Sequence, residues 1–575
     1  ALGDLAEGLA PPSDADSLAY HFAIPRQILA EGCAVFVERA ADGAAPLLQQ
    51  MTYLAALALG GETALTLWCM LSGWAAILVT YALARRWLSR AWALTVAAVF
   101  MTLPAFLYGA GTGQVEARLA GFTVVAVAAA VAAGRGGGPG AAVVAGLAGG
   151  FAMASKYPGL LLVALCGLVI LGRRGGLGRA VAYSAAALAV GSQWYVWNWL
   201  HTGDPVFPML FGVLPYHPSV AWNPDQHAAF GQWVRTLEAP SPRGVVDMLL
   251  YPLRAILDAP EAWEAGRTGL GPAALLLAPF AAVGAWRRRH GLATHDLTVM
   301  AAVCVGFYLL WFFFGASQRV RHYLPFMPLI LVGLAVAAHR AVRGAPTRHA
   351  VAAALAATIM VQSAAQAIMV RPFVQRMTQG QTREEYLIRT VPFAFAPFWI
   401  NATLDPASHK VLTTARQWLY LLDVPYHLVH PYQQAVVEAR PGMSDVGRFW
   451  AQMRAAGITH VALFLPTTNR LVHTGEGGMV DLIVLAQQAG CLGEVKRLEG
   501  PVHGGSRTLS GFGGATLGSV SILALTPAGC PFARAVSIQM EPAPVFAFGG
   551  RPSGASQDQT PLGLIGSPAR PPSTP

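Results

Sequence analysis

Ten apolar runs, most of them as long as a bilayer core is thick, occupy the middle of the chain. A helix needs about 20 consecutive apolar residues to cross the hydrocarbon region of a membrane. Charged residues make up 12% of the 575 residues, against about 25% in a typical soluble protein. The sequence therefore predicts an α-helical polytopic membrane protein, with apolar runs at 63–84, 91–109, 114–133, 141–155, 157–172, 179–200, 269–287, 296–315, 322–340 and 349–370.

Arginine clusters between these runs indicate how many of them cross. The runs 141–155 and 157–172 are short, since 15 residues of helix reach only about 22 Å. If both cross, the clusters all fall on one side of the membrane: Arg85-Arg86, Arg135, Arg173-Arg174, Arg287-Arg288-Arg289, and Arg340, Arg343 and Arg348. Positive residues favour cytoplasmic loops. We therefore expect ten crossings of the inner (cytoplasmic) membrane, with the arginine-rich loops in the cytoplasm.

This topology places both ends of the apolar region on the outer side. An outer N-terminus requires an earlier membrane segment, so we expect one to precede Ala1. The net charge of +10 does not indicate a nucleic-acid-binding protein, because the arginines lie in short clusters between apolar runs rather than on one face.

Residues 1–62 are expected to form an outer loop that carries an acidic motif and short interfacial helices near 17–31 and 46–59. Residues 63–370 form the transmembrane domain. Its long outer loop, 201–268, contains apolar residues at helical spacing, which predicts a helix on the outer surface; these residues are Val246, Leu249, Leu250, Leu253 and Leu257.

Hydropathy drops after residue 371, and residues 371–540 are expected to form an extracytoplasmic part with a small α/β domain at about 401–535. The pattern predicts strands at 410–413, 460–464 and 519–526, helices at 444–456 and 479–489, and a glycine-rich loop at 504–518. Cys491 and Cys530 could form a disulfide in an oxidising compartment. The Pro-, Gly- and Ser-rich tail, 541–575, is predicted to be disordered.

Two carboxylates, Asp14 and Asp16, lie two residues apart just before Tyr20-His21. A carboxylate at a membrane surface can act as a general base, and Asp16 is our candidate for that role. The alternative is that both carboxylates are solvated loop residues, or that Ser13 or Asp16 caps the helix that begins near residue 17. A pair of carboxylates can also hold a divalent cation, although two ligands alone do not define a metal site.

Further ionisable residues fall on the same predicted side. Glu116 opens the run 114–133, where the helix dipole alone would favour an acid. Lys156, between two short runs, is a candidate phosphate partner or a snorkelling lysine. Arg319 and Arg321 are outer-side cations against the usual charge bias, which favours a binding role. Asn198, His201 and Asp204 are weaker candidates.

The order of these fragments resembles bacterial members of the GT-C glycosyltransferase superfamily, related to protein O-mannosyltransferases and aminoarabinose transferases. The matching stretches are Asp16–His21, Leu103-Pro104 with Gly111–Glu116, Ala154–Tyr157, Trp194–Trp199, Thr202–Pro208 and Arg321–Pro325, in order over about residues 10–340.

The resemblance implies an inverting transfer, on the outer face, of a sugar from a polyprenyl-phosphate lipid. It implies Asp16 or Asp14 as base, Glu116 as a second acid, and a lipid-phosphate or substrate site drawn from Lys156, Arg319, Arg321, His21, Tyr20 and Tyr323. The sequence departs from the family pattern in two ways: Asp14 and Asp16 are not adjacent acids, and the second acidic segment carries Glu116 rather than Asp. A catalytically inactive accessory subunit of a larger membrane complex is the alternative. A transporter is disfavoured, because the ionisable residues gather at one surface rather than at the bilayer midplane.

Overall fold

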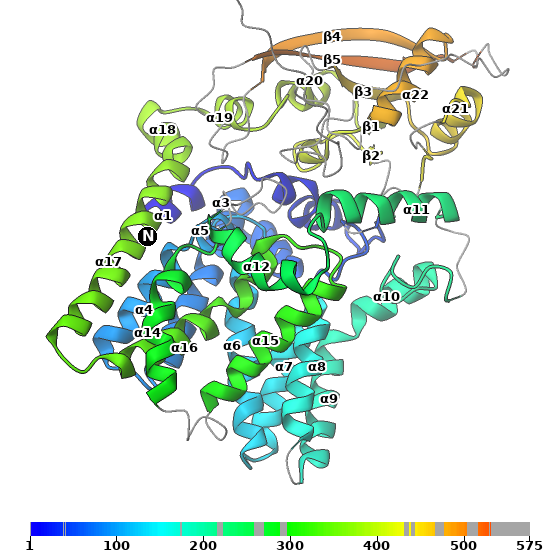
Figure 1. The fold of residues 1–575 in the computed structure, drawn as a ribbon. Coiled ribbons are helices and arrows are strands. Elements are labelled where there is room, and N and C mark those ends of the chain that lie inside the picture. Colours follow the sequence, from blue (N-terminus) through cyan, green and yellow to red (C-terminus); the bar gives the residue numbers. More distant parts are fainter. Residues whose placement is uncertain are drawn as a thin grey trace, which may run out of the picture.

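The computed structural model describes residues 2–37, 39–40, 42–172, 175–214, 222–257, 269–287, 296–429, 436–438, 443–465, 477–502, 516–527 and 530. A bundle of helices carries a small α/β domain at one end, and the N-terminus lies near that same end (Figure 1). The mainly helical architecture predicted from the apolar runs is confirmed.

In the first half of the described chain, all named secondary-structure elements are helices. Its elements are α1 (Leu2–Gly8), η1 (Ser17–His21), α2 (Ala23–Glu31), α3 (Leu48–Ala84), α4 (Arg90–Thr102), α5 (Pro104–Ala110), α6 (Glu116–Gly134), α7 (Pro139–Ser155), α8 (Gly159–Leu171), α9 (Gly176–Gly191), α10 (Gln193–Thr202), α11 (Pro224–Trp233), η2 (Val234–Glu238) and α12 (Val245–Leu257).

The second half completes the bundle and then forms the α/β domain. The bundle helices are α14 (Ala273–Arg287), α15 (Asp296–Phe314), η5 (Val320–Phe326), α16 (Met327–Ala341) and α17 (Ala345–Met369). The domain comprises α18 (Arg371–Gln379), α19 (Arg383–Thr390), α20 (Phe395–Thr403), β1 (Val411–Thr413), η6 (Arg416–Trp418), β2 (Tyr426–Leu428), α21 (Val446–Ala455), β3 (His460–Leu465), α22 (Gly477–Gln488), β4 (Leu492–Val502) and β5 (Thr516–Leu525).

Each predicted apolar run coincides with one or two helices. Five helical segments are long and apolar enough to cross a membrane, namely α3, α6, α15, η5 with α16, and α17. Helices α4 and α5, bent by 69° at their junction, make a sixth if they count as one span. Helices α7, α8 and α14 are shorter apolar helices. The protein is therefore a multi-pass membrane protein, while the count of ten crossings stays a prediction.

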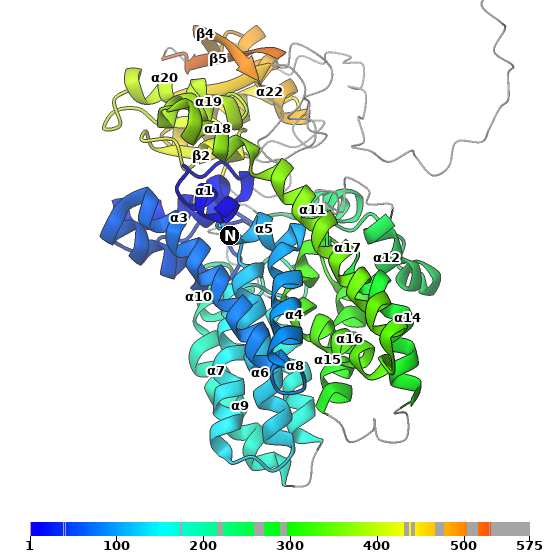
Figure 2. The same cartoon turned by 90° about the vertical axis from the view of Figure 1, so that its left-hand side faces the viewer.

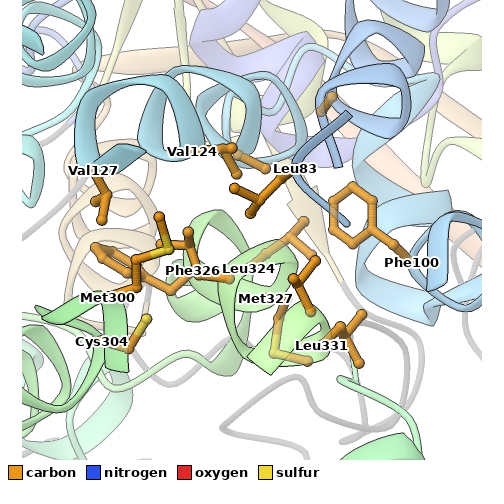
Figure 3. Close-up of a cluster of buried hydrophobic side chains, with 14 of the residues drawn as sticks. Leu83, Phe100, Val124, Val127, Met300, Cys304, Leu324, Phe326, Met327 and Leu331 are labelled. Carbon is orange, nitrogen blue, oxygen red and sulfur yellow. The ribbon is translucent and has the colours of Figure 1, made fainter. Parts of the chain in front are cut away.

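The core of the bundle lies where α3, α4, α6, α15, η5 and α16 converge. Figure 3 shows Phe100, Val124, Phe326 and Met327 among the aliphatic and aromatic side chains packed there. Burial of this apolar surface holds η5 against α6. This contact matters because the beginnings of both elements carry charged residues at the same end of the bundle.

The connections between α6 and α7 and between α8 and α9 lie at the end of the bundle remote from the sheet (Figures 1 and 2). Arg135, just after α6, pairs with Asp296 at the start of α15 at 2.6 Å. Arg287 donates to the carbonyl of Ala341 at 2.8 Å. Arg135 and Arg287, from two of the arginine clusters, therefore lie at the same end of the bundle, as the predicted topology requires.

The predicted interfacial segments are helical. Residues 17–31 form η1 and α2, and residues 46–59 lie mostly in the first part of α3. Gly60 and Gly61 break the helical geometry of α3, and Gly61 has a φ of 67° that favours glycine. This break separates the outer part of α3 from its membrane part close to the expected boundary at residue 62.

The predicted surface helix is α12. Val246, Leu249 and Leu257 are about two-thirds exposed, whereas Tyr251 and Ala255 are buried against the protein. The apolar face therefore points away from the protein, as expected for a helix lying at a membrane surface.

The α/β domain contains a five-stranded mixed sheet with the strand order β2-β1-β3-β5-β4. β1 is parallel to β2 and β3, while β5 is antiparallel to β3 and β4. The predicted strands and helices correspond to β1, β3, β5, α21 and α22, but the sequence did not predict α18, α19, α20, β2 and β4. Cys491 and Cys530 form a disulfide. Most of the predicted loop 504–518 and the tail 541–575 lie outside the described residues.

Candidate functional site

Asp16 lies just before η1, at the end of the bundle that faces the α/β domain. Its Oδ2 is 2.8 Å from Nη2 of Arg321, on η5. Its Oδ1 is 3.3 Å from Nη2 of Arg416, on η6 of the α/β domain. The carboxylate side chain is 16% exposed, so three distant parts of the chain meet in a mostly buried ionic contact.

Glu116, the first residue of α6, lies beside this contact. Its Oε1 pairs with Nζ of Lys156 and lies 3.7 Å from Nε2 of His322 and 4.0 Å from Nε of Arg321. Its Oε2 is buried and accepts no hydrogen bond within the described chain. Arg321 therefore links the two carboxylates, and Glu116 keeps one acceptor for a ligand. We call Asp16, Glu116, Lys156, Arg321 and Arg416 the ionic cluster.

Close backbone packing brings Glu116 to Asp16. A Cβ atom at Gly113 would lie 2.7 Å from Cβ of His21, so only glycine permits this approach of the α5–α6 loop to η1. The amide of Gly113 donates to Oγ of Ser17 at 2.9 Å. Arg118 is buried and donates to the carbonyls of Gly109, Gln114 and Ala110, which fixes the loop before Glu116.

Lys156 occupies the tip of a tight helical hairpin. It is the extended residue after α7, and α8 begins three residues later. A Cβ atom at Gly159 would lie 2.4 Å from backbone atoms of Ala152 and Met153, so α8 returns directly against α7. The hairpin presents the lysine to Glu116 with its side chain 20% exposed.

The segment before Arg321 is held by residues of η2, of α12 and of the connection between them. Gln318 donates its amide N–H to the carbonyl of Glu238 at 2.7 Å and exchanges side-chain hydrogen bonds with the backbone of Ser241. Tyr251 of α12 donates to the carbonyl of Gln318. Arg319 forms two hydrogen bonds with Glu238, at 2.8 and 2.7 Å. These contacts fix the position from which Arg321 reaches Asp16.

The two neighbouring acids have different surroundings. Asp14 accepts hydrogen bonds from N and Oγ of Ser17, both at 2.9 Å, and from the hydroxyl of Tyr108. Burial, together with the charge of Asp16, raises the pKa of Asp14. Burial would also raise the pKa of Asp16, but Arg321 and Arg416 outweigh it and hold that pKa well below its usual range. Asp14 thus accepts hydrogen bonds from the first residue of η1, while Asp16 is one of the two carboxylates of the ionic cluster.

The other predicted residues lie around the ionic cluster or outside it. His21 is buried and its Nδ1 is 2.7 Å from the side-chain Nε2 of Gln50, and the ring of Tyr20 lies against the His21 ring at a tilt of 33°. Arg319 is paired with Glu238 rather than with either carboxylate. Tyr323 lies among aromatic side chains and donates to the carbonyl of Cys304 at 2.9 Å. Its hydroxyl is thus directed into the core.

The weaker candidates hold the 201–214 loop together instead. Asn198 donates to the carbonyl of Ala44 at 2.7 Å, and Asp204 accepts from the amides of Val206 and Leu210, both at 2.8 Å. His201 stacks on Phe36. None of the three has a recorded contact with the ionic cluster in the described chain.

Three residues near the carboxylates were missed as site residues. Arg416 and its second partner Asp42, with Oδ2 at 2.8 Å, come from segments to which no site motif drew attention. His322 was quoted in a motif, but its neighbour Tyr323 was chosen instead. Adjacent residues of a 3₁₀ turn point in different directions, so the motif did not show which ring reaches Glu116.

A small pocket lies beside Glu116, Lys156 and His322. Its other walls are mostly apolar side chains of α6, α8, α15 and η5, among them Leu119, Leu162, Phe307 and Phe326. A cavity with charged groups at one end and apolar walls elsewhere suits an amphiphile with an anionic head.

The residues present offer little to a metal ion. Both oxygens of Asp16 contact guanidinium groups. Among the described residues there is no group of three or more His, Cys, Asp or Glu side chains that could hold a metal. The described residues therefore provide no set of ligands for the divalent cation considered from the sequence.

No family model and no curated protein match the chain. Among solved structures, ArnT from Cupriavidus metallidurans bound to undecaprenyl phosphate aligns with a TM-score of 0.50 and 15% identity, covering 92% of this chain and 96% of that chain. Its apo state gives 0.48 and 13% identity, covering 92% and 96%. The arabinofuranosyltransferase AftD from Mycobacteria gives 0.42 and 16% identity, covering 91% of this chain and 41% of that chain.

ArnT, an aminoarabinose transferase, is a GT-C superfamily glycosyltransferase. The GT-C resemblance drawn from the order of the motifs is therefore confirmed at the level of the fold.

Proposed function

We propose that the protein is a membrane glycosyltransferase that moves a sugar from a polyprenyl-phosphate carrier to an acceptor. The observation that carries this proposal is the ionic cluster, of which Glu116 and Lys156 line a mostly apolar pocket. Charged residues are costly within a membrane bundle and usually serve a binding or catalytic purpose there. Here four of them, Asp16, Glu116, Lys156 and Arg321, converge from four separate segments.

The donor lipid fits this arrangement by charge and polarity. Lys156 lines the pocket and Arg321 lies 4.0 Å from Glu116, which also lines it, so both cations would bind the phosphate. The apolar walls formed by Leu119, Phe307 and Phe326 would contact the first isoprenoid units. The fold neighbour ArnT binds undecaprenyl phosphate, a lipid of this class, which supports the proposal.

The chemistry follows from the carboxylate beside the phosphate site. Asp16, an anion at neutral pH, would accept the proton of the acceptor hydroxyl as its oxygen attacks the anomeric carbon. The bond from that carbon to the phosphate oxygen breaks, and the lipid phosphate leaves with the electron pair. Lys156 and Arg321 would stabilise the departing charge. Attack opposite to the leaving phosphate inverts the anomeric centre. The unpaired Oε2 of Glu116 would accept a sugar hydroxyl.

We place the reaction on the outer face of the cytoplasmic membrane, with the α/β domain extracytoplasmic. The described arginines at the opposite end of the bundle support this orientation through the positive-inside tendency. The Cys491–Cys530 disulfide suits an oxidising compartment.

The test uses the full chain reconstituted in lipid vesicles. Binding of undecaprenyl phosphate is measured first, and transfer is then followed with polyprenyl-phosphate pentoses and hexoses and a cell-envelope acceptor extract. We expect binding by the wild type, and transfer that Asp16→Asn abolishes and Asp296→Asn, at the other end of the bundle, preserves. Binding without transfer from any donor would favour the accessory-subunit alternative. Absence of lipid binding would refute the donor assignment.

A further inference from the structure

The α/β domain contributes a charged side chain to the ionic cluster. Arg416 begins η6, 400 residues after Asp16 in the sequence. Its Nη2 lies 3.3 Å from Oδ1 of Asp16 and 2.8 Å from Oδ2 of Asp42. Both carboxylates belong to the N-terminal outer segment. One guanidinium of the α/β domain therefore bridges two acids of that segment.

The two arginines that hold Asp16 are not equivalent. Arg321 also lies 4.0 Å from Glu116, which lines the pocket, and Glu116 pairs with Lys156. Arg416 approaches the other oxygen of Asp16, and its second partner is Asp42. A phosphate bound between Lys156 and Arg321 would compete with Asp16 for Arg321. It would leave the contact with Arg416 in place.

We propose that Arg416 is a positioning residue: it keeps the Asp16 carboxylate ionised and oriented while Arg321 is engaged by the donor phosphate. The site would then be complete only when the α/β domain is docked on the bundle. This inference rests on the proposed glycosyltransferase function and deepens it.

The docking contacts around Arg416 support a fixed position. The amide of Tyr420 donates to the carbonyl of Leu18 on η1 at 3.0 Å. Arg26 of α2 donates to the carbonyl of Leu422 at 2.9 Å and pairs with Asp423. Trp418 of η6 is fully buried. The turn that carries Arg416 is thus held to the same short segment that carries Asp16.

The charged groups around Asp16 come from several elements. Arg321 and Arg319 belong to η5 and the segment before it, His21 to η1, and Arg416 to η6. Asp42 and Tyr20 face Arg416 from the N-terminal segment. Removing the positive charge of Arg416 therefore takes away one of the two guanidinium groups in contact with Asp16. The pKa of Asp16 would therefore rise in the variant.

The experiment compares Arg416→Gln with wild type in the full chain, using the most active polyprenyl-phosphate sugar found in the transfer assay. We expect kcat to fall by about 100-fold, the usual consequence of a small displacement of a catalytic group. The donor KM and the affinity for undecaprenyl phosphate should stay near the wild-type values. In the pH profile of kcat, the acid limb of Arg416→Gln should lie at higher pH than that of the wild type. Arg416→Lys should restore part of kcat, and Arg321→Gln should weaken lipid binding instead.

The matched control is Arg383→Gln. Arg383 pairs with Glu62 at 2.8 Å across the same domain interface but does not touch Asp16. The inference is refuted if Arg416→Gln retains wild-type kcat and acid limb, or if Arg383→Gln reproduces both changes. In either case only the role of Arg416 is refuted, and the proposed glycosyltransferase function stands, because the wild type still transfers sugar. A wild-type chain that transfers nothing would refute the proposed function itself.

Discussion

The Lys156–Glu116 pair provides the sharpest separation of structural and functional roles. The Glu116 side chain is 3% exposed, and Lys156 is its nearest cation. Removing one partner of a buried ion pair costs about 3–5 kcal/mol, because the other charge is left uncompensated. Arg321 and His322 stay within 4.0 Å of Oε1. We therefore expect Lys156→Met to lower the free energy of unfolding by about 3 kcal/mol, at the low end of that range.

The double variant Lys156→Met/Glu116→Gln should recover most of this loss. Replacing both members of a buried pair by neutral residues is often close to neutral, so its stability should lie within about 1 kcal/mol of wild type. In the double variant the lipid phosphate would still lack its contact with the ammonium group of Lys156. A hydrogen bond to a charged group is worth about 1.5–3 kcal/mol, so undecaprenyl phosphate should bind about 10- to 100-fold more weakly.

The assay pairs denaturant unfolding of the solubilised full chain with lipid binding in vesicles. Lys496→Met, on the exposed face of β4, is the matched control and should change neither quantity. Wild-type lipid affinity in the double variant would refute the role of Lys156 as a phosphate ligand. Failure of the double variant to regain stability would refute the pairing with Glu116.

Three further predictions follow from the same contacts. Asp14→Asn should keep most of the transfer rate, because an amide oxygen can still accept hydrogen bonds from Ser17. Asp16→Asn should lower the single-turnover transfer rate by about 10²- to 10⁴-fold. Equal losses in the two variants would contradict the different roles assigned to Asp14 and Asp16. Tyr323→Phe should lower the free energy of unfolding by about 1 kcal/mol, the value of one hydrogen bond, and leave lipid binding unchanged. Weaker lipid binding in this variant would show that Tyr323 belongs to the binding site. Burial lowers the pKa of His427 from 6.5 to about 4, so the folded α/β domain favours the neutral ring. The contribution of His427 to the free energy of unfolding should be complete above pH 6.5 and should be lost as the pH falls towards 4. Melting curves measured at several pH values should show a weaker pH dependence for His427→Gln.

The sequence predicted those features that depend on local pattern. Apolar runs of bilayer length located the membrane helices, and the local sequence pattern after residue 371 located β1, β3 and β5. The position of Gly113 and Glu116 at the start of an apolar run indicated an acid at one end of the bundle. The convergence of Asp16 and Glu116 on Arg321 followed from placing their segments on one side of a membrane, and the structure brings these side chains together.

Contacts made across the fold could not be read in this way. Arg416 lies in a short turn of the α/β domain, and nothing in its neighbours indicates a carboxylate 400 residues away. The choice between Asp14 and Asp16 depends on the turn that precedes η1, which points one acid at its own helix and the other at η5. Strand β4, with exposed residues such as Lys496 and Arg497 over much of its length, lacks a clear alternating pattern.

The most direct test of the proposed function is an experimental structure of the full chain with bound undecaprenyl phosphate. The account predicts the phosphate in contact with Lys156 and Arg321, and the isoprenoid chain against Leu119 and Phe326. Asp16 should then remain on Arg416, beside the phosphate. A phosphate bound elsewhere, with Lys156 still on Glu116 and Arg321 still on Asp16, would contradict it.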